Sequence, residues 1–184
     1  MTIEAGPDEL YTTLARVADV PALAQLVNGA YRAEGGRGGW TTERELVAGP
    51  RVDAAAIEAM IGAPGHALLV LRAQSGLFAC AAVAKLGDGV AGLGLLAVRP
   101  ALQGNGLGRQ MLAAAERYVR EHYRAARMEV EVLAGREELL AWAERRGYRP
   151  SGETRPFRDD GRWGAPQQAG LTLQVLGREI APAP

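Results

Sequence analysis

Apolar and polar residues follow two different periods along this chain, and together they predict an ordered series of strands and helices. Residues 11–17 alternate as a strand does. Asp19 and Pro21 then stand in the order of an N-cap and a first-turn proline. The helix predicted after them, to about residue 33, has five apolar residues at helical spacing: Leu23, Leu26, Val27, Ala30 and Tyr31. Residues 35–39, GGRGG, favour a loop, and Asp53 opens a second helix that ends at Gly62.

The middle of the chain alternates in short apolar runs, and the C-terminal half mixes helices with strands. Residues 66–72, 77–85 and 90–98 are separated by glycine turns, so they predict an antiparallel meander. A long amphipathic helix is expected from about 105 to 123 and another over 137–146. Strands are expected over 128–133, 148–153 and 171–176, which gives the order β-α-α-β-β-β-α-β-α-β-β. The first of these three strands turns Glu129 and Glu131 outward.

Composition narrows the classes of protein that fit this pattern. The 184 residues carry 21 basic and 21 acidic side chains, so no basic excess favours nucleic acid as a partner. Cys80 is the one cysteine and there are two histidines, so we expect no disulfide and no metal site. Neither a signal peptide nor an apolar run of about eighteen residues is visible, so no membrane is expected and the interpretation is a cytoplasmic protein. We expect a flexible N-terminus over 1–11 and one domain over 12–181.

The segment that carries chemistry is a glycine-rich turn between an apolar strand and the long helix. The strand ends at Val98-Arg99-Pro100, and the turn reads Gln-Gly-Asn-Gly-Leu-Gly over 103–108. Glycine lets backbone N–H groups approach a ligand, and the helix start adds unpaired donors, which together suit a diphosphate. A Walker A loop is excluded because Lys85, the only lysine, lies upstream of the turn. A dinucleotide fingerprint fits poorly because no third glycine stands at the required spacing.

The remaining pattern, Gln-x-x-Gly-x-Gly after Val-x-Pro, resembles the CoA-binding loop of the GNAT superfamily of acyl-CoA-dependent N-acyltransferases. The order of elements over residues 12–180 is similar too. The resemblance implies an α/β (α+β) fold with a mixed, mostly antiparallel sheet of about six to seven strands, flanked by about four helices and splayed between the fourth and fifth strands. It also implies acetyl-CoA as cosubstrate, held by Leu96, Ala97, Val98, Gln103, Gly104, Asn105, Gly106, Leu107, Gly108 and Arg109.

The resemblance places catalysis at the fourth strand, where a backbone N–H near Leu96 would polarise the thioester carbonyl. Many family members carry a glutamate where this chain has Gly92 and a tyrosine where it has Ala143. Glu153 is therefore our candidate for the base or amine anchor, ahead of Glu129, Glu131, Glu34 and Glu43. Tyr148 is the nearby phenol that could act as acid, with water as the alternative donor.

Four residues are candidates for the acceptor site: Tyr31, Glu34, Trp40 and Arg136. Trp40 either caps the acceptor pocket or packs in a small satellite cluster. Arg136 stands where the family has an asparagine, and it would bind a carboxylate, bind the CoA phosphates, or pair with Glu138.

The sequence is thus interpreted as an N-acetyltransferase that moves an acetyl group from acetyl-CoA to a primary amine of a small molecule by direct attack in a ternary complex. The alternative is a catalytically inactive CoA-binding sensor or interaction protein of the same fold. Sheet edges often pair in this family, so a homodimer is compatible with either interpretation.

Overall fold

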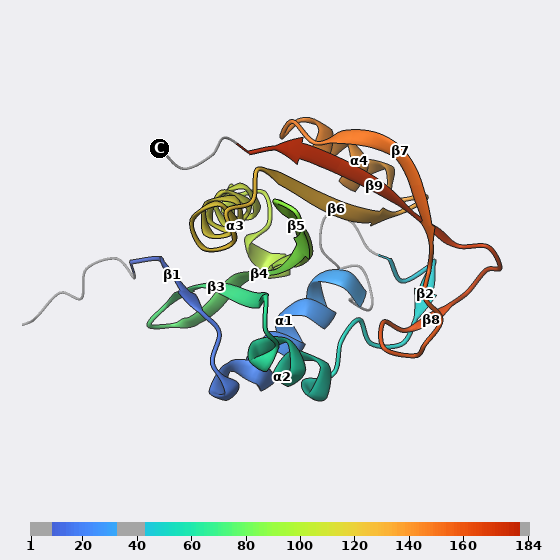
Figure 1. Cartoon of the computed structure of the whole chain (residues 1–184). Helices are drawn as coiled ribbons and strands as arrows, with labels where there is room; N and C mark the ends of the chain where they lie inside the picture. Colours follow the sequence, from blue (N-terminus) through green and yellow to red (C-terminus); the bar gives the residue numbers. More distant parts are fainter. Residues whose placement is uncertain (1–8, 33–42, 181–184) are drawn as a thin grey trace, which may run out of the picture.

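The computed structural model describes residues 9–32 and 43–180, and their centre is one seven-stranded sheet (Figure 1). The spatial order is β1-β3-β4-β5-β6-β9-β7, and every neighbouring pair is antiparallel except β5 and β6, which run parallel. The strands are β1 (Tyr11–Leu14), β3 (His66–Ala73), β4 (Gly76–Gly87), β5 (Val90–Val98), β6 (Arg127–Leu133), β7 (Arg149–Pro156) and β9 (Thr172–Glu179). The predicted meander is β3-β4-β5.

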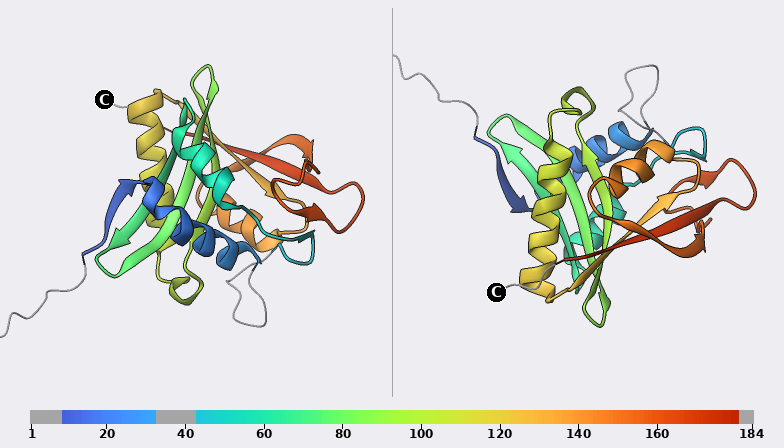
Figure 2. Two further views of the ribbon diagram at one scale, coloured as in Figure 1. Left: turned by 90° about the horizontal axis from the view of Figure 1, so that it is seen from below. Right: turned by 90° about the horizontal axis from the view of Figure 1, so that it is seen from above.

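Helices cover both faces of this sheet, and alternate residues of the central strands divide between two cores (Figure 2). Leu69 and Leu71 of β3 pack with the helix α3 (Leu107–Tyr123), while Leu68 and Val70 pack with α1 (Val20–Arg32) and α2 (Ala54–Gly62). The short helix α4 (Glu137–Glu144) adds its buried residues to the α3 side. The predicted fold class is therefore confirmed.

Several predicted element ends shift by a few residues for local reasons. The first strand stops at Leu14 because Val17–Asp19 form a 3-10 turn, η1, with the Arg16 N–H donating to Asp19. Asp53 caps α2 as predicted, its side chain accepting from the Ala56 N–H at 2.8 Å. A two-stranded pair, β2 (Val47–Ala48) with β8 (Ala165–Pro166), has no counterpart in the prediction, because two residues are too few to show a period.

The sheet opens between β5 and β6. Their parallel pairing covers Val90–Leu93 and stops there. Two residues on, Leu95 takes the left-handed conformation with φ +47°, which is uncommon for a residue with a side chain, and the β4–β5 register shifts at the same level. Beyond it β5 stays on β4, while β6 stays on β9. The predicted splay between the fourth and fifth strands is thus confirmed.

No helix in residues 9–32 or 43–180 combines the length and apolar character that a membrane crossing requires. Within those same residues, no group of three or more His, Cys, Asp or Glu side chains is arranged to hold a metal ion. The predicted GGRGG loop and residues 1–8 of the predicted N-terminal segment lie outside the described residues.

Candidate active site

A cavity of about 920 Å³ lies where β5 leaves β6, and it continues to the glycine-rich turn. It has three kinds of wall: the open edge of β5, the loop that enters α3, and side chains from α1 and α4. The described residues that line it are Ala30, Tyr31, Leu96, Ala97, Val98, Pro100, Gln103, Gly104, Asn105, Gly106, Gly108, Arg109, Arg136, Leu139, Trp142, Arg145 and Arg146.

The open edge of β5 presents backbone groups to this cavity. The Leu96 carbonyl accepts a hydrogen bond from the Tyr31 hydroxyl at 3.2 Å, and the Val98 carbonyl accepts one from Gln103 Nε2 at 3.1 Å. In a strand, the N–H and C=O of one residue point the same way. The N–H groups of Leu96 and Val98 therefore face the same edge, where β6 no longer pairs with them.

The turn at the other end of the cavity has the conformation that its glycines allow. Gly104 and Gly106 have φ of +85° and +80°, and Gly106 is the N-cap of α3. Glycine has no side chain to cap the helix, so among the described residues the first-turn N–H groups receive no N-cap hydrogen bond. The Asn105 amide donates to the Leu102 carbonyl at 3.2 Å, so this side chain shapes the loop. The result is a set of N–H donors at a helix N-terminus, which favours an anion.

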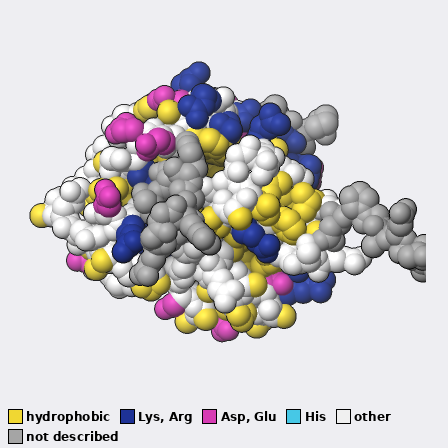
Figure 3. Space-filling model, turned by 180° about the vertical axis from the view of Figure 1, so that it is seen from behind, with side chains coloured by type: hydrophobic (Ala, Val, Ile, Leu, Met, Phe, Trp, Pro, Cys, Tyr) yellow, Lys and Arg dark blue, Asp and Glu magenta, His cyan; other side chains and the backbone are white. Residues whose placement is uncertain are grey.

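Among the described residues, the charged side chains that line the cavity are all basic. The lining contains Arg109, Arg136, Arg145 and Arg146, and no described lining residue is acidic. Arg146 stacks over the Trp142 ring at 3.8 Å. Burial lowers the pKa of Arg146 below its ordinary value, and the positive charges of Arg145 and Arg109 lower it further. Arg136 pairs with Glu43, whereas Arg109, Arg145 and Arg146 pair with no carboxylate among the described residues, and their unbalanced positive charge favours an anionic ligand. On one face of the molecule, basic side chains gather along the upper edge in Figure 3.

Comparison with known proteins decides the family. The model of the acetyltransferase (GNAT) family matches residues 31–148. The chain belongs to the GNAT family. The match starts at Tyr31 and ends at Tyr148, so it contains both the β5 edge and the glycine turn. No protein among the curated ones matches the chain.

Solved structures share the fold at low sequence identity. The ribosomal-protein-S18-alanine N-acetyltransferase of Escherichia coli aligns with a TM-score of 0.68 and 18% identity, over 96% of this chain and 97% of that one. The protein yncA of Salmonella typhimurium, solved with its cofactor acetyl-CoA, aligns with a TM-score of 0.63 and 16% identity, over 95% of each chain. Mutant forms of the spermidine/spermine N-acetyltransferase SpeG of Vibrio cholerae align with a TM-score of 0.63 and 11% identity, over 93% of this chain and 94% of that one.

Most residues proposed to hold the cofactor lie together in the cavity lining. Leu107 is the one that does not line it, because its side chain packs against the core under α3. Of the acceptor-site candidates, Tyr31 and Arg136 line the cavity. Glu34 and Trp40 lie outside the described residues.

The two side chains proposed for acid and base lie elsewhere, and we correct both assignments. Glu153 is exposed on β7, an edge strand of the sheet, and pairs with Arg155 at 2.7 Å, which lowers the pKa of its carboxyl. Tyr148 is 1% exposed, and its hydroxyl donates to Glu116 at 2.9 Å. Burial, followed by the charge of Glu116, holds the pKa of this phenol well above its ordinary value. Neither side chain reaches the cavity lining.

The two positions where many family members carry catalytic side chains also have no side chain in the cavity. Gly92 lies in the part of β5 still paired with β6, opposite Glu129, and a Cβ there would meet Leu86 at 3.3 Å. Ala143 is buried in the core beneath α4, and Leu139 and Trp142 are the α4 side chains that line the cavity.

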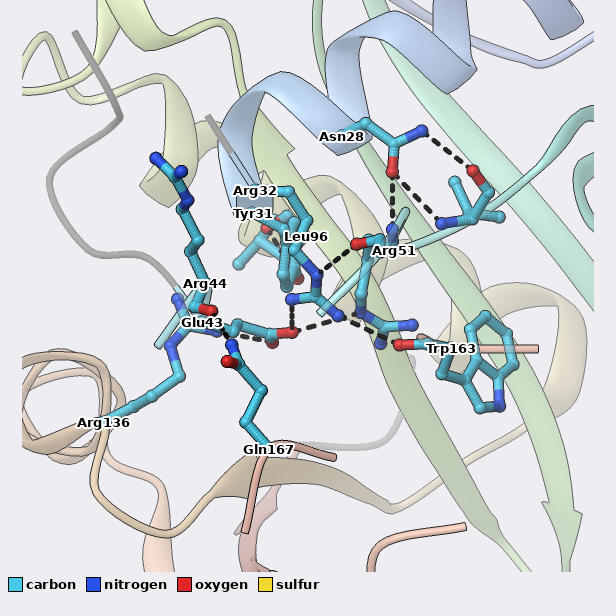
Figure 4. Close-up of polar contacts among 12 residues, drawn as sticks. Asn28, Tyr31, Arg32, Glu43, Arg44, Arg51, Leu96, Arg136, Trp163 and Gln167 are labelled. Atoms are coloured by element: carbon cyan, nitrogen blue, oxygen red, sulfur yellow. Dashed lines mark hydrogen bonds and ion pairs between the residues drawn. The ribbon is translucent and has the colours of Figure 1, made fainter. Parts of the chain in front are cut away.

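A buried charge cluster at the Leu96 end of the cavity was missed from the sequence (Figure 4). Glu43 is 5% exposed and pairs with Arg32, with Arg136 at 2.9 Å and with Arg51 at 3.8 Å. The guanidinium groups of Arg51 and Arg136 lie 5.2 and 5.4 Å from the Tyr31 ring centroid. These residues come from separate parts of the chain, so no local pattern reveals the cluster. Arg136 pairs with Glu43 and not with Glu138.

Replacement of Glu43 tests how far this cluster holds the site together. Glu43→Gln leaves three arginines without their carboxylate, so we expect the free energy of unfolding to fall by about 3 kcal/mol. Chemical denaturation measures the loss. Glu131→Gln, which removes an exposed carboxylate paired with Arg155, is the matched control and is expected to shift the transition little. Equal shifts in the two variants would contradict a structural role for the cluster.

Tyr148→Phe tests the corrected assignment of this phenol as a core residue. The change removes only the hydrogen bond to Glu116, a charged acceptor, so we expect the unfolding free energy to fall by about 1.5 kcal/mol. Thermal and urea denaturation report the difference. A variant as stable as the parent chain would show that the buried hydroxyl does not hold Glu116.

Proposed function

We propose that this protein is an N-acetyltransferase that transfers the acetyl group of acetyl-CoA to a primary amine of a small molecule. The observation that carries the proposal is one continuous cavity with two different ends. One end has an unpaired strand edge beside Tyr31, and the other has N–H donors and arginines at the start of α3. This combination suits a ligand that is neutral and extended at one end and polyanionic at the other.

The residues present fit acetyl-CoA. The first-turn N–H groups of α3 and the loop from Gln103 to Gly106 would hold the pyrophosphate, with Arg109, Arg145 and Arg146 as countercharges. The N–H groups of Leu96 and Val98 would pair with the amides of the pantetheine arm, at the edge of β5 that β6 no longer pairs with. Bound acetyl-CoA supplies an activated acetyl thioester, whose carbon forms the new C–N bond as the C–S bond breaks.

The chain's contribution to this reaction is mainly orientation and polarisation. The Leu96 N–H, facing the open edge, would donate to the oxygen on which negative charge develops. Tyr31 holds the Leu96 carbonyl and so fixes the direction of that N–H. Burial raises the pKa of Tyr31, so its hydroxyl stays a neutral donor at neutral pH. The amine would release its proton to solvent, and water would protonate the thiolate.

Direct transfer also agrees with the state of the one thiol in the chain. Cys80 is fully buried on β4, and burial raises its pKa to about 12. Its Sγ–H contacts the Leu95 carbonyl at 3.4 Å, and Cys80 is not among the residues that line the cavity. A neutral, enclosed thiol is a poor nucleophile, which supports attack by the acceptor amine itself.

A second candidate function is CoA binding without transfer. It is favoured by the lining of the cavity, which holds no aspartate, glutamate or histidine among the described residues. The two candidates differ in turnover and not in cofactor binding.

Turnover with an amine panel separates the two candidates. The protein is incubated with acetyl-CoA and amino acids, polyamines, small aromatic amines and peptides, while the release of free CoA thiol is followed. We expect at least one acceptor to raise the rate well above background hydrolysis. Tight CoA binding by calorimetry with no acceptor above background would favour the second candidate.

Two substitutions at one position test the location of the pyrophosphate. Gly106 has a left-handed conformation, which asparagine and aspartate tolerate better than other residues, and a Cβ there would find only Arg109 at 4.0 Å. Gly106→Asp adds a negative charge beside the proposed phosphates, so we expect CoA affinity to fall by about a hundredfold or more. Gly106→Asn has the same shape without the charge and is the control. Equal affinities for the two variants in calorimetry would place the phosphates elsewhere.

A further inference from the structure

The cluster around Glu43 carries more positive charge than its carboxylate balances. Arg32, Arg51 and Arg136 surround one glutamate, and among the described residues Glu43 is the only carboxylate that pairs with any of them. Arg32 and Arg136 are each less than one-tenth exposed. Charges withdrawn from water at this depth are costly unless a counter-ion reaches them.

Two guanidinium groups of the cluster also have donors to spare. Arg136 Nε and Arg51 Nη1 are buried without a hydrogen-bond partner among the described residues. Buried donors are rarely left unpaired in a native protein. Of these two arginines, Arg136 lines the cavity.

Arg136 is held at the end of the cavity where the acetyl group would be delivered. Arg136 Nη1 donates to Glu43 at 2.9 Å, and the Arg136 guanidinium lies over the Tyr31 ring. The Tyr31 hydroxyl in turn donates to the Leu96 carbonyl. The proposed phosphate site is served by Arg109, Arg145 and Arg146 at the other end. The positive charge at Arg136 is therefore beside the acceptor and not beside the phosphates.

We propose that the acceptor is a primary amine that also carries a carboxylate, an amino-acid-like molecule, and that Arg136 binds this carboxylate. The inference rests on the proposed acetyl transfer. A guanidinium has a planar fork that matches a carboxylate, and a partly satisfied, prepositioned one loses little freedom when it binds. The same charge repels polycationic acceptors such as polyamines, since Glu43 is already paired with arginines.

The first test compares each amino acid with its own carboxamide in the CoA-release assay. The amine of a carboxamide has a lower pKa than the amine of the corresponding acid, so kcat/KM is expressed per concentration of neutral amine. We expect the acid to be preferred by about tenfold or more, through a lower KM, because only the acid forms an ion pair with the guanidinium. Amides or polyamines accepted as well as the acids would overturn the inference and leave acetyl transfer standing.

The second test assigns the preference to Arg136. In Arg136→Gln we expect the acid-over-amide preference to fall to about one, with CoA affinity unchanged in calorimetry. Arg117→Gln, which removes an exposed arginine of α3, is the control and should keep the preference. Arg136→Lys retains charge without the fork and should show an intermediate preference.

The outcomes distinguish this inference from the proposed function. Failure of the parent protein to bind CoA overturns the proposed function. If folded Arg136→Gln keeps the acid-over-amide preference, or if its CoA affinity falls, the proposed role of Arg136 is overturned and the proposed function is not. Should Arg136→Gln not fold, Arg136→Lys and the acid-to-amide ratio of the parent chain decide the question.

Discussion

The rest of the site depends on the parallel pairing of β5 with β6. This pairing ends before β5 does, and the site lies where it ends. Four residue pairs join the two strands, and past Leu93 the strand β6 no longer pairs with β5. The cause is local: Leu95 adopts a left-handed conformation, the β4–β5 register shifts, and β5 turns away with β4 while β6 remains on β9. A fully paired sheet would satisfy every backbone group and leave no place for an extended ligand. Two strands that part after four residue pairs leave a slot whose wall is already made of aligned donors and acceptors.

Side chains partly satisfy the opened edge and keep it in one conformation. The Tyr31 hydroxyl donates to the Leu96 carbonyl, and Gln103 Nε2 donates to the Val98 carbonyl. Both interactions occupy carbonyls, so among the described residues the N–H groups of the same edge are left for the ligand. Gln103 thereby also ties the glycine turn to the strand, which couples the two ends of the cavity through one side chain. The glutamine beside the glycines thus bonds the protein's own backbone in this structure.

The sequence predicted those parts of the fold and site whose physics is local. The meander, the helix after Asp53 and the glycine turn depend on residues within a few positions of one another, and all appear in the structure. The Glu43 cluster depends on four residues brought together by the tertiary fold, and β2 with β8 is too short for a periodic pattern. Tyr148 and Glu153 were misplaced because a residue type suggests a chemical role but not the direction of its side chain. Tyr148 is buried and points to Glu116 of α3, and Glu153 lies on β7, an edge strand.

A net charge of zero conceals a strongly uneven distribution. The described cavity lining has four arginines and no carboxylate, whereas β6 and the edge strand β7 carry Glu129, Glu131 and Glu153 around Arg155. The choice of arginine also has a physical consequence. Lys85 is the only lysine in the sequence, so the cavity has arginines as its basic residues. A lysine in a buried site readily loses its proton. A guanidinium keeps its charge even where burial and like-charged neighbours disfavour the charged form, as they do at Arg146. An arginine-lined cavity therefore stays positive throughout the neutral range, and its attraction for anions depends on ionic strength much more than on pH.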